Sequence, residues 1–219
     1  MKIEKTTLKS HLEFKIGDGY KQVGFSEKDE STVWERFRKG DDQSLIYLYR
    51  TYANALFNYG RQLTNRNEFV RDCIQELFYD LIDRRKHLSD VLSIKSYLFA
   101  SLKRKILRGL KREERLHLND SQSQAFELDF SANSTPISQT FDKDKHALIE
   151  RKLNSLPVLQ KEVILLHFYE GMSYAEIARV MNIKIKSARA LTYRALASLA
   201  KKLSSYKEAF YLLILLHSG

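Results

Sequence analysis

The sequence predicts an all-α protein, built of two helical modules joined by a linker. Apolar residues recur at helical spacing through most of residues 31–205, and a 43% hydrophobic content over 219 residues is enough for two cores. Only two prolines and eight glycines occur in the chain, which favours long helices. Residues 116–141 hold no Lys or Arg and are rich in Ser, Asn and Gln, a linker composition that divides the chain.

The first module is expected to be a four-helix bundle within residues 31–115, after a loosely ordered extension at 1–30. Ser31 is the expected cap of a short helix that Gly40 closes. Asp41 or Asp42 can then cap the next helix. The three longer helices are expected at about residues 42–63, 68–85 and 93–115.

The last helix of this module is strongly basic, with Glu113 and Glu114 as its acids. Its cations are Lys95, Lys103, Arg104, Lys105, Arg108, Lys111, Arg112 and Arg115. Tyr97 and Phe99 precede most of the charge. Aromatic rings beside cations suit the stacking of unpaired bases, although rings at helical spacing also fit a core. The helix is therefore a candidate surface for single-stranded nucleic acid.

The second module is expected at residues 142–205, ahead of an apolar tail at 206–219. Its first helix should run from about 142 to 154. Pro157 suits the start of a second helix that ends near Gly171. The residues expected to be buried in that second helix are Val158, Leu159, Val163 and Leu166, with Phe168 or Tyr169 as a further candidate.

The last two helices of this module are predicted to form a helix-turn-helix. Ser173 and Glu176 have the spacing of a capping box, and Asn182 tolerates the turn after a first helix at about 174–181. The buried stripe expected in the second helix is Ile185, Ala188, Leu191, Ala195, Leu196 and Leu199. The residues expected on the exposed face of this helix, together with the lysine before it, are Lys184, Lys186, Ser187, Arg189, Ala190, Tyr193 and Arg194. Short polar side chains and Arg can read base edges while cations hold phosphates, so this face suits a major groove.

Charge and cysteine usage narrow the class of protein. A formal charge of +10 favours a polyanionic partner, either nucleic acid or an acidic membrane surface. The single cysteine, Cys73, falls on an apolar helix face, so burial is its expected role and a reducing cytoplasm its expected compartment. No signal-peptide pattern opens the chain, and the apolar tail is too short to span a bilayer. We find no metal-ligand spacing, phosphate loop or nucleophile motif, and therefore expect no enzyme, cofactor, metal or small-molecule substrate.

Motifs in both modules carry a family resemblance. They are the residues 72–78 (DCIQELF), 97–99 (YLF), 171–178 (GMSYAEIA) and 193–196 (YRAL). In this order, with a linker between them, the motifs resemble those of a bacterial sigma factor of the extracytoplasmic-function group, within the sigma-70 family and of Bacteroidetes-like type. The first module is similar to sigma domain two and the second to sigma domain four.

The resemblance implies a non-catalytic initiation subunit that binds core RNA polymerase and promoter DNA, both as duplex and as melted strand. It further implies a possible anti-sigma factor as partner. The residues implied in binding core polymerase are Asp72, Gln75, Glu76 and Tyr79. Those implied at the minus-ten element are Tyr97, Lys103, Arg104, Lys105, Arg108, Lys111 and Arg112. The exposed face of the helix-turn-helix, from Lys184 to Arg194, is implied at the minus-thirty-five element.

Two alternatives stay open on the sequence. The acidic patch that includes Asp72 is also compatible with an ordinary solvated helix face. A free-standing DNA-binding regulator, with the first module used for dimerisation or sensing, would explain the helix-turn-helix but not the basic helix before the linker. Two positions depart from the common family pattern, since Arg104 stands where many relatives have Asn and Leu191 where many have Arg. These departures leave the DNA sequence preference open.

Overall fold

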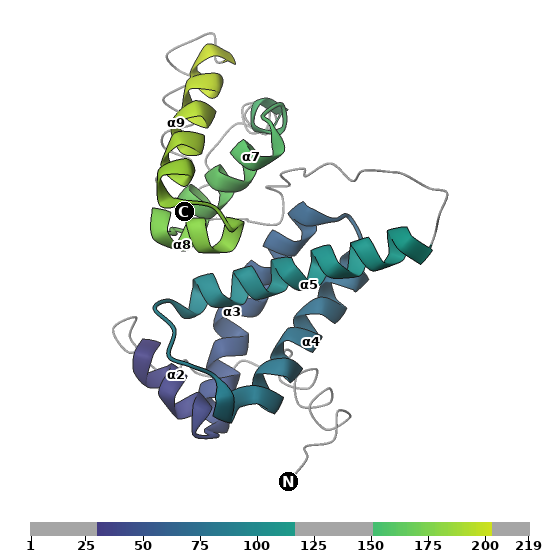
Figure 1. Ribbon diagram of the computed structural model, residues 1–219, viewed down its shortest axis with the longest axis vertical. Coiled ribbons are helices and arrows are strands. Elements are labelled where there is room, and N and C mark those ends of the chain that lie inside the picture. The colour runs from purple at the N-terminus through teal and green to yellow at the C-terminus, as the bar shows by residue number, and fades with distance from the viewer. Residues whose placement is uncertain (1–29, 117–150, 203–219) are drawn as a thin grey trace, which may run out of the picture.

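The computed structural model of the chain describes residues 30–116 and 151–202, and every regular element within them is helical (Figure 1). This confirms the predicted all-α class. The predictions for the N-terminal extension, for nearly all of the linker and for the apolar tail lie outside the described residues. So does the start of the helix expected at about 142–154, of which residues 151–154 are described and helical.

The first module contains the four expected helices. They are α2 (Glu30–Arg38), α3 (Asp42–Leu63), α4 (Asn67–Arg84) and α5 (Ile94–Leu116), with a short 3-10 helix, η2 (Arg85–His87), after α4. Helix α5 lies across α3 and α4 and packs against both (Figure 1). Its buried residues Leu98, Leu102 and Ile106 meet the apolar faces of these two helices and form the centre of the module.

The capping predictions for this module are confirmed at Asp41 and wrong at Ser31. Asp41 accepts a hydrogen bond from the backbone N–H of Ser44 at 3.2 Å and so caps α3. Gly40 precedes it with a φ of +98°, a conformation that glycine adopts without strain. Ser31 lies inside α2 and cannot cap it, because the helix already begins at Glu30. The Glu30 carboxylate accepts a hydrogen bond from the Tyr52 hydroxyl at 2.8 Å, which joins α2 to α3.

Helices α3 and α4 approach closely at Gly60. A Cβ atom at this position would collide with the Val70 side chain, so the absence of a side chain is what lets the two helices meet there. Gly109 in α5 has the same role, since a Cβ there would lie 2.5 Å from Cζ of Phe69. Packing of this kind fixes the position of α5 relative to the rest of the module.

After the helical residues 151–154, the second module contains α7 (Val158–Ile164), the π-helix η4 (Leu165–Tyr169), α8 (Tyr174–Met181) and α9 (Ile185–Lys202). The prediction that Val158 and Leu159 are buried is wrong, because 46% and 52% of their surfaces are exposed. The face of α7 that turns inward instead includes Lys161 and Glu162, which are 4% and 2% exposed. These polar groups can be buried because other segments supply their hydrogen-bond partners.

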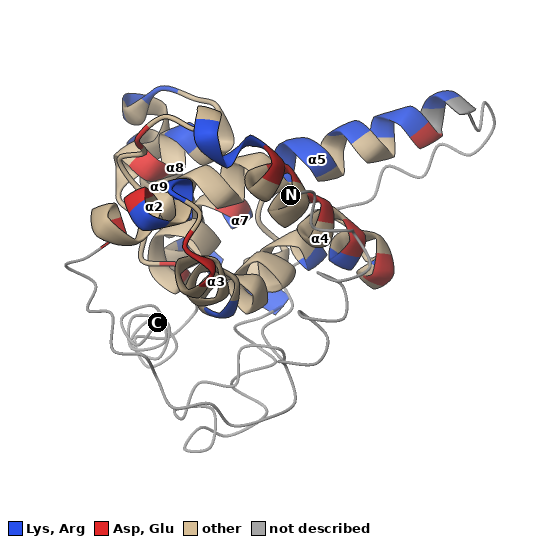
Figure 2. Cartoon of the chain, turned by 90° about the horizontal axis from the view of Figure 1, so that it is seen from below, with Lys and Arg blue, Asp and Glu red and all other residues tan. Residues whose placement is uncertain are grey.

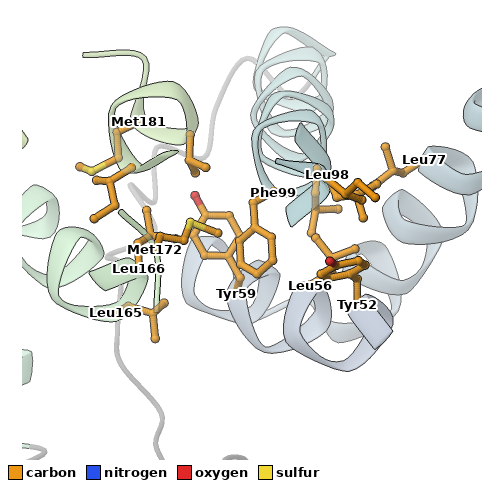
Figure 3. Packing of buried hydrophobic residues seen from close by; sticks show 14 of the residues in the cluster. Tyr52, Leu56, Tyr59, Leu77, Leu98, Phe99, Leu165, Leu166, Met172 and Met181 are labelled. Atoms are coloured by element: carbon orange, nitrogen blue, oxygen red, sulfur yellow. The ribbon is translucent and has the colours of Figure 1, made fainter. Parts of the chain in front are cut away.

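The two modules are packed together, with α8 against α5 (Figure 1). Figure 3 shows Tyr59 and Phe99 of the first module pointing toward Met172 and Leu166 of the second. All four side chains are almost fully buried and belong to one continuous apolar cluster. Within the residues described, no helix is long and apolar enough to cross a membrane.

Candidate nucleic-acid interface

The helix-turn-helix begins with the predicted capping box. The backbone N–H of Ser173 donates to the Glu176 carboxylate at 2.8 Å, and the backbone N–H of Glu176 donates to the Ser173 hydroxyl at 3.4 Å. Burial alone raises the pKa of Glu176, but hydrogen bonds from Ser93 and Ser173 outweigh it and hold this pKa below its usual value. Asn182 then turns the chain in the left-handed conformation, with a φ of 54°, so that α9 follows α8 directly.

The seven residues predicted to face DNA lie together, on or directly before the first ten residues of α9. Six are exposed and Ser187 is half-buried, and the Tyr193 ring is 77% exposed. The buried stripe differs from the predicted one, because Ile185 is 45% exposed while Thr192 is buried. The Thr192 hydroxyl donates to the Ala188 carbonyl at 3.1 Å, which satisfies the polar group inside the helix and explains how threonine can face the core.

An aromatic stack lies under Arg189, the central cation of this face. The Arg189 guanidinium carbon lies 5.6 Å from the centroid of the Tyr174 ring, and Tyr174 stacks on His167 at 4.6 Å between centroids. Nδ1 of His167 is 2.9 Å from the Met172 carbonyl oxygen. The sequence predicted Tyr174 as the first residue of its helix and indicated no role for His167. Neither residue has a local signal that would have predicted the stack.

The second candidate surface is a cationic row on α5. Arg104, Arg108, Lys111 and Arg112 are all exposed, and their spacing places them on one side of the helix. Figure 2 shows Lys and Arg following this helix out to its free end. Among the side chains that the structure describes, no acid pairs with any of these four cations, which suits contact with a phosphate backbone.

Three other residues predicted at the minus-ten surface lie elsewhere on α5. Lys103 points to the second module, where its Nζ lies 2.6 Å from the Glu162 carboxylate. Lys105 lies against α4, with its Nζ 2.8 Å from Asp80. Tyr97 is half-buried and packs edge-on against Trp34, with 5.5 Å between the ring centroids.

Phe99, which the sequence left open between base stacking and core, belongs to the core, as does Phe78 of α4. Phe78 and Phe99 are fully buried. Phe99 packs on Tyr59, with 5.1 Å between ring centroids. Neither ring can reach a base in this arrangement.

The residues predicted to bind core polymerase share one face of α4. Asp72 and Glu76 are exposed and one turn apart, while Gln75 and Tyr79 beside them are half-buried. Lys105 of α5 reaches the edge of this patch, with its Nζ 3.4 Å from Glu76. Cys73 lies behind the patch, and burial raises the pKa of its thiol to about 11, as expected for a structural cysteine.

Comparison with known proteins identifies the family of the chain that carries these surfaces. The family model for sigma-70 region 2 matches residues 48–116, and that for sigma-70 region 4 matches residues 146–199. The chain is 24% identical over 187 residues to the ECF RNA polymerase sigma-E factor of Haemophilus influenzae, covering 80% of this chain and 95% of that one. It is 20% identical over 173 residues to the RNA polymerase sigma factor YlaC of Bacillus subtilis, covering 75% and 95%.

Two solved structures have a similar fold. One is CnrH in complex with the cytosolic domain of CnrY, with a TM-score of 0.53 at 18% identity, covering 78% of this chain and 95% of that one. The other is the sigma factor RpoE of Bartonella quintana in complex with the anti-sigma factor NepR, with a TM-score of 0.54 at 18% identity, covering 75% and 98%.

Because both region models match in the expected order, the chain belongs to the sigma-70 family, and its relatives place it in the extracytoplasmic-function group. It is an RNA polymerase sigma factor, a subunit that binds core polymerase and directs initiation at promoters.

Proposed function

We propose that the two modules of this sigma factor divide promoter recognition between two surfaces. The exposed row on α5 holds the melted strand of the minus-ten element, and the start of α9 reads the minus-thirty-five element as duplex. The observation that carries this proposal is the presence of two separate cationic faces, one on each family-matched module.

The composition of the α5 row supports a contact to single-stranded DNA. Its cations recur along one side of a helix that rises about 1.5 Å per residue, so Arg104 and Arg112 are about 12 Å apart along the axis. That length matches a few phosphates of one strand. Tyr97, Lys103 and Lys105 belong to this proposed surface by resemblance, and they would have to turn away from their present partners to reach DNA.

The chemistry of the α9 face supports major-groove reading. Ser187, Arg189 and Ala190 lie near the start of the helix, where side chains of a recognition helix reach base edges. Arg189 is suited to bidentate contact with a guanine. The side chains placed around them, which we assign to phosphates, are Lys184, Lys186, Tyr193 and Arg194.

The acidic patch on α4 is proposed to dock on core polymerase. Asp72 and Glu76 form an exposed acidic pair in a chain with a formal charge of +10, so this patch is poorly suited to DNA and well suited to a protein partner. Gln75 and Tyr79 complete the patch with hydrogen-bonding groups.

Several further predictions belong to the same proposal. We assign residues 31–115 to the core-binding and minus-ten module, 116–141 to the linker and 142–205 to the minus-thirty-five module. The factor is proposed to act without catalytic chemistry of its own and to work in the cytoplasm, where its DNA template is. An anti-sigma factor is a further proposed partner, supported by the two structural neighbours described in complex with CnrY and NepR. The Bacteroidetes-like origin stays a prediction.

Co-elution with cognate core RNA polymerase tests the function. We expect the chain to co-elute stably and the Asp72→Ala/Gln75→Ala variant to be lost from the complex. Glu68→Ala, on the same helix with a side chain 82% exposed, is the matched control and should still bind. New start sites should then appear when the complex transcribes a pool of genomic fragments.

The opposite result would favour a free-standing regulator. In that case the chain alone would bind duplex sites tightly, would not associate with core polymerase, and would be indifferent to substitution at Asp72 and Gln75.

A further inference from the structure

The exposed Arg189 side chain of α9 contacts an aromatic ring through its face. Its guanidinium carbon lies 5.6 Å from the centroid of the Tyr174 ring, and within the described part of the chain no carboxylate or carbonyl pairs with its N–H groups. An aromatic ring attracts a guanidinium placed over it and leaves the in-plane N–H donors unused. Those donors are the groups that contact the edge of a guanine, so stacking on Tyr174 and contact with a base are compatible.

Arg194, on the same helix, is held differently. Its Nε donates to the carbonyl of Ala190, one turn earlier in α9, at 3.2 Å. Part of its donor set is therefore engaged by its own backbone, which suits a contact with a phosphate more than a bidentate contact with a base edge. The ring beside Arg189 thus provides an arrangement of donors that Arg194 does not have.

The Tyr174 ring is itself fixed by two contacts. Tyr174 is the first residue of α8, so the capping box of Ser173 and Glu176 fixes its backbone. Its ring is stacked on His167, with 4.6 Å between the centroids and 29° between the planes. The ring is only half-buried, although the apolar core of the module lies next to it. The position of the ring is therefore well determined at the surface, beside the recognition face.

The turn between η4 and α8 holds the His167 ring in place. Nδ1 of His167 lies 2.9 Å from the Met172 carbonyl oxygen, and because a carbonyl only accepts, Nδ1 carries the hydrogen. The Met172 N–H donates to the Leu166 carbonyl at 2.9 Å, and the Met172 side chain is almost fully buried. Hydrogen bonds on both sides of Met172 therefore close the turn and orient the imidazole against Tyr174.

A π-helical segment brings His167 to this position. The segment η4 is centred on His167, and the Glu170 N–H donates to the carbonyl of Leu165, five residues earlier, at 3.0 Å. The wider turn lets Leu165 and Leu166 stay buried while His167 lies half-buried against Tyr174. Short π-helical turns are rare and occur frequently at functional sites. This irregular backbone is a second indication that the stack does more than fill the core.

We propose that Tyr174, supported by His167, is a positioning residue that determines how strongly α9 discriminates at the base pair contacted by Arg189. This inference rests on the proposed role of α9 in reading the minus-thirty-five element as duplex. The stack confines Arg189 to few rotamers, so a base with two acceptors placed for its donors gains more from the contact than other bases do. The phosphate contacts of α9 do not depend on the stack.

Selection of DNA by the full chain assembled with cognate core polymerase tests the inference. The probe is a promoter fragment identified by its start site, with the base pairs of the minus-thirty-five element randomised. We expect Arg189→Ala to relax the preference at one base pair, which identifies that pair. Tyr174→Leu keeps an apolar side chain at the start of α8 but removes the ring. It should reduce discrimination at the same base pair by about twofold to fivefold, as expected for the loss of one exposed cation–π contact.

Two further variants and a matched control separate positioning from a loss of folding. Tyr174→Phe keeps the ring and should keep the discrimination. His167→Leu removes the supporting ring and should reduce discrimination at the same base pair, by less than Tyr174→Leu does. Phe57→Leu is the control, because Phe57 of α3 also carries guanidinium groups, those of Arg61 and Arg71, at 5.9 and 4.8 Å from its centroid. It lies in the first module and should leave the preference unchanged.

A double-mutant cycle and the salt dependence respond to positioning and not to a purely structural role. Tyr174→Leu added to Arg189→Ala should cause no further loss of discrimination, because the ring then has no cation to position. The slope of log affinity against log salt should be the same for Tyr174→Leu and the unchanged chain, because no phosphate contact is lost. A ring that only supported the fold of α8 would lower affinity on all sequences alike, with or without Arg189.

Three results would overturn the inference and leave the proposed function intact. In the first, Arg189→Ala relaxes the preference while Tyr174→Leu leaves it unchanged. In the second, Tyr174→Leu lowers affinity equally on every sequence. In the third, discrimination becomes sharper without the ring, which would mean that Tyr174 holds Arg189 away from DNA. A failure of the proposed function is recognised separately. A chain that does not assemble with core polymerase, or an Arg189→Ala variant that keeps the full preference, overturns the role on which the inference rests and the inference with it.

Discussion

Arg189, which we propose contacts a base, lies over the aromatic ring of Tyr174. That ring is in turn stacked on His167. Stacking on an aromatic face restricts the rotamers of a long side chain, so less conformational entropy is lost when the guanidinium meets a base. The stack joins η4, α8 and α9, so the position of Arg189 depends on three elements.

Substitution at Arg189 should change sequence preference more than general affinity. We expect Arg189→Ala to cost about 1–3 kcal/mol on the preferred duplex and to relax the choice of base at one position. Lys184→Ala, assigned to a phosphate, should weaken binding to all sequences alike and reduce the salt slope by about 1. Selection from a random duplex pool, with titrations at several salt concentrations, measures both effects. An Arg189→Ala variant that loses affinity equally on every sequence would contradict the assignment.

Burial at single positions was the least predictable property of the chain. The sequence indicated that Val158 and Leu159 are buried and did not indicate that Glu162 is. Hydropathy ranks side chains by their transfer from water, and it contains no information on whether a distant hydroxyl and ammonium will meet a carboxylate. The same limit explains Thr192, which is buried because its hydroxyl bonds within its own helix.

At the scale of elements, α8 depends on its N-terminal cap. It has only eight residues, from Tyr174 to Met181, a length at which an isolated helix is unstable in water. Its capping box satisfies backbone N–H groups that would otherwise have no partner. The orientation of α9 follows from α8 through the turn at Asn182, so the cap is a condition for presenting the recognition face.

Removal of the cap should destabilise the protein measurably. We expect Ser173→Ala to lower the free energy of unfolding by about 1 kcal/mol in urea titrations near neutral pH. Ser31→Ala is a matched control, because Ser31 lies exposed within α2 and is not the N-cap of that helix, and its effect should stay within about 0.5 kcal/mol. Equal losses in the two variants would mean that the capping box contributes no specific stability.

The same variant should alter the response to acid. Because the pKa of Glu176 is held below its unfolded value of 4.5, its hydrogen bonds contribute stability above that pH, and this contribution is lost as the pH falls through the lowered pKa. Ser173→Ala removes part of the cause of the lowering. Unfolding curves taken down the acid range should therefore show a smaller loss of stability in Ser173→Ala than in the unchanged chain, and parallel losses would contradict the role of Ser173.

Helices themselves were well predicted from periodicity and caps. The start of α3 after Asp41, the capping box at Ser173 and the turn at Asn182 are each encoded within a few residues. The π-helical segment η4 was not predicted, since the expected helix ran on to Glu170 without a change of type. No local residue pattern marks that change, and the backbone adjusts there while Leu165 and Leu166 pack into the core.

At the scale of the whole molecule, the two modules are expected to unfold together. They share one apolar cluster and the buried network of Glu162, so separating them exposes apolar surface and an uncompensated charge. Cooperative unfolding follows when the contact between two units is comparable in strength to their own cores.

Differential scanning calorimetry measures this cooperativity. We expect a single transition for the unchanged chain, with calorimetric and van't Hoff enthalpies that agree. Glu162→Gln should separate it into two transitions, one for each module, while Glu68→Gln should keep one. Two independent transitions in the unchanged chain would show that the modules are not coupled.

The sequence by itself determined the all-α class, the helix-turn-helix with its caps and exposed cations, the basic helix α5 and the family to which the chain belongs. These properties depend on hydrogen bonds and periodicities that repeat within one or two helical turns. Only the tertiary structure decided which cations of α5 are open and which are covered. The partners of Glu162 lie 59 and 103 positions away, and the modules that carry them are joined by a linker whose composition says nothing of how they pack. A contact of that kind depends on the shape and charge of two surfaces that exist only after each module has folded.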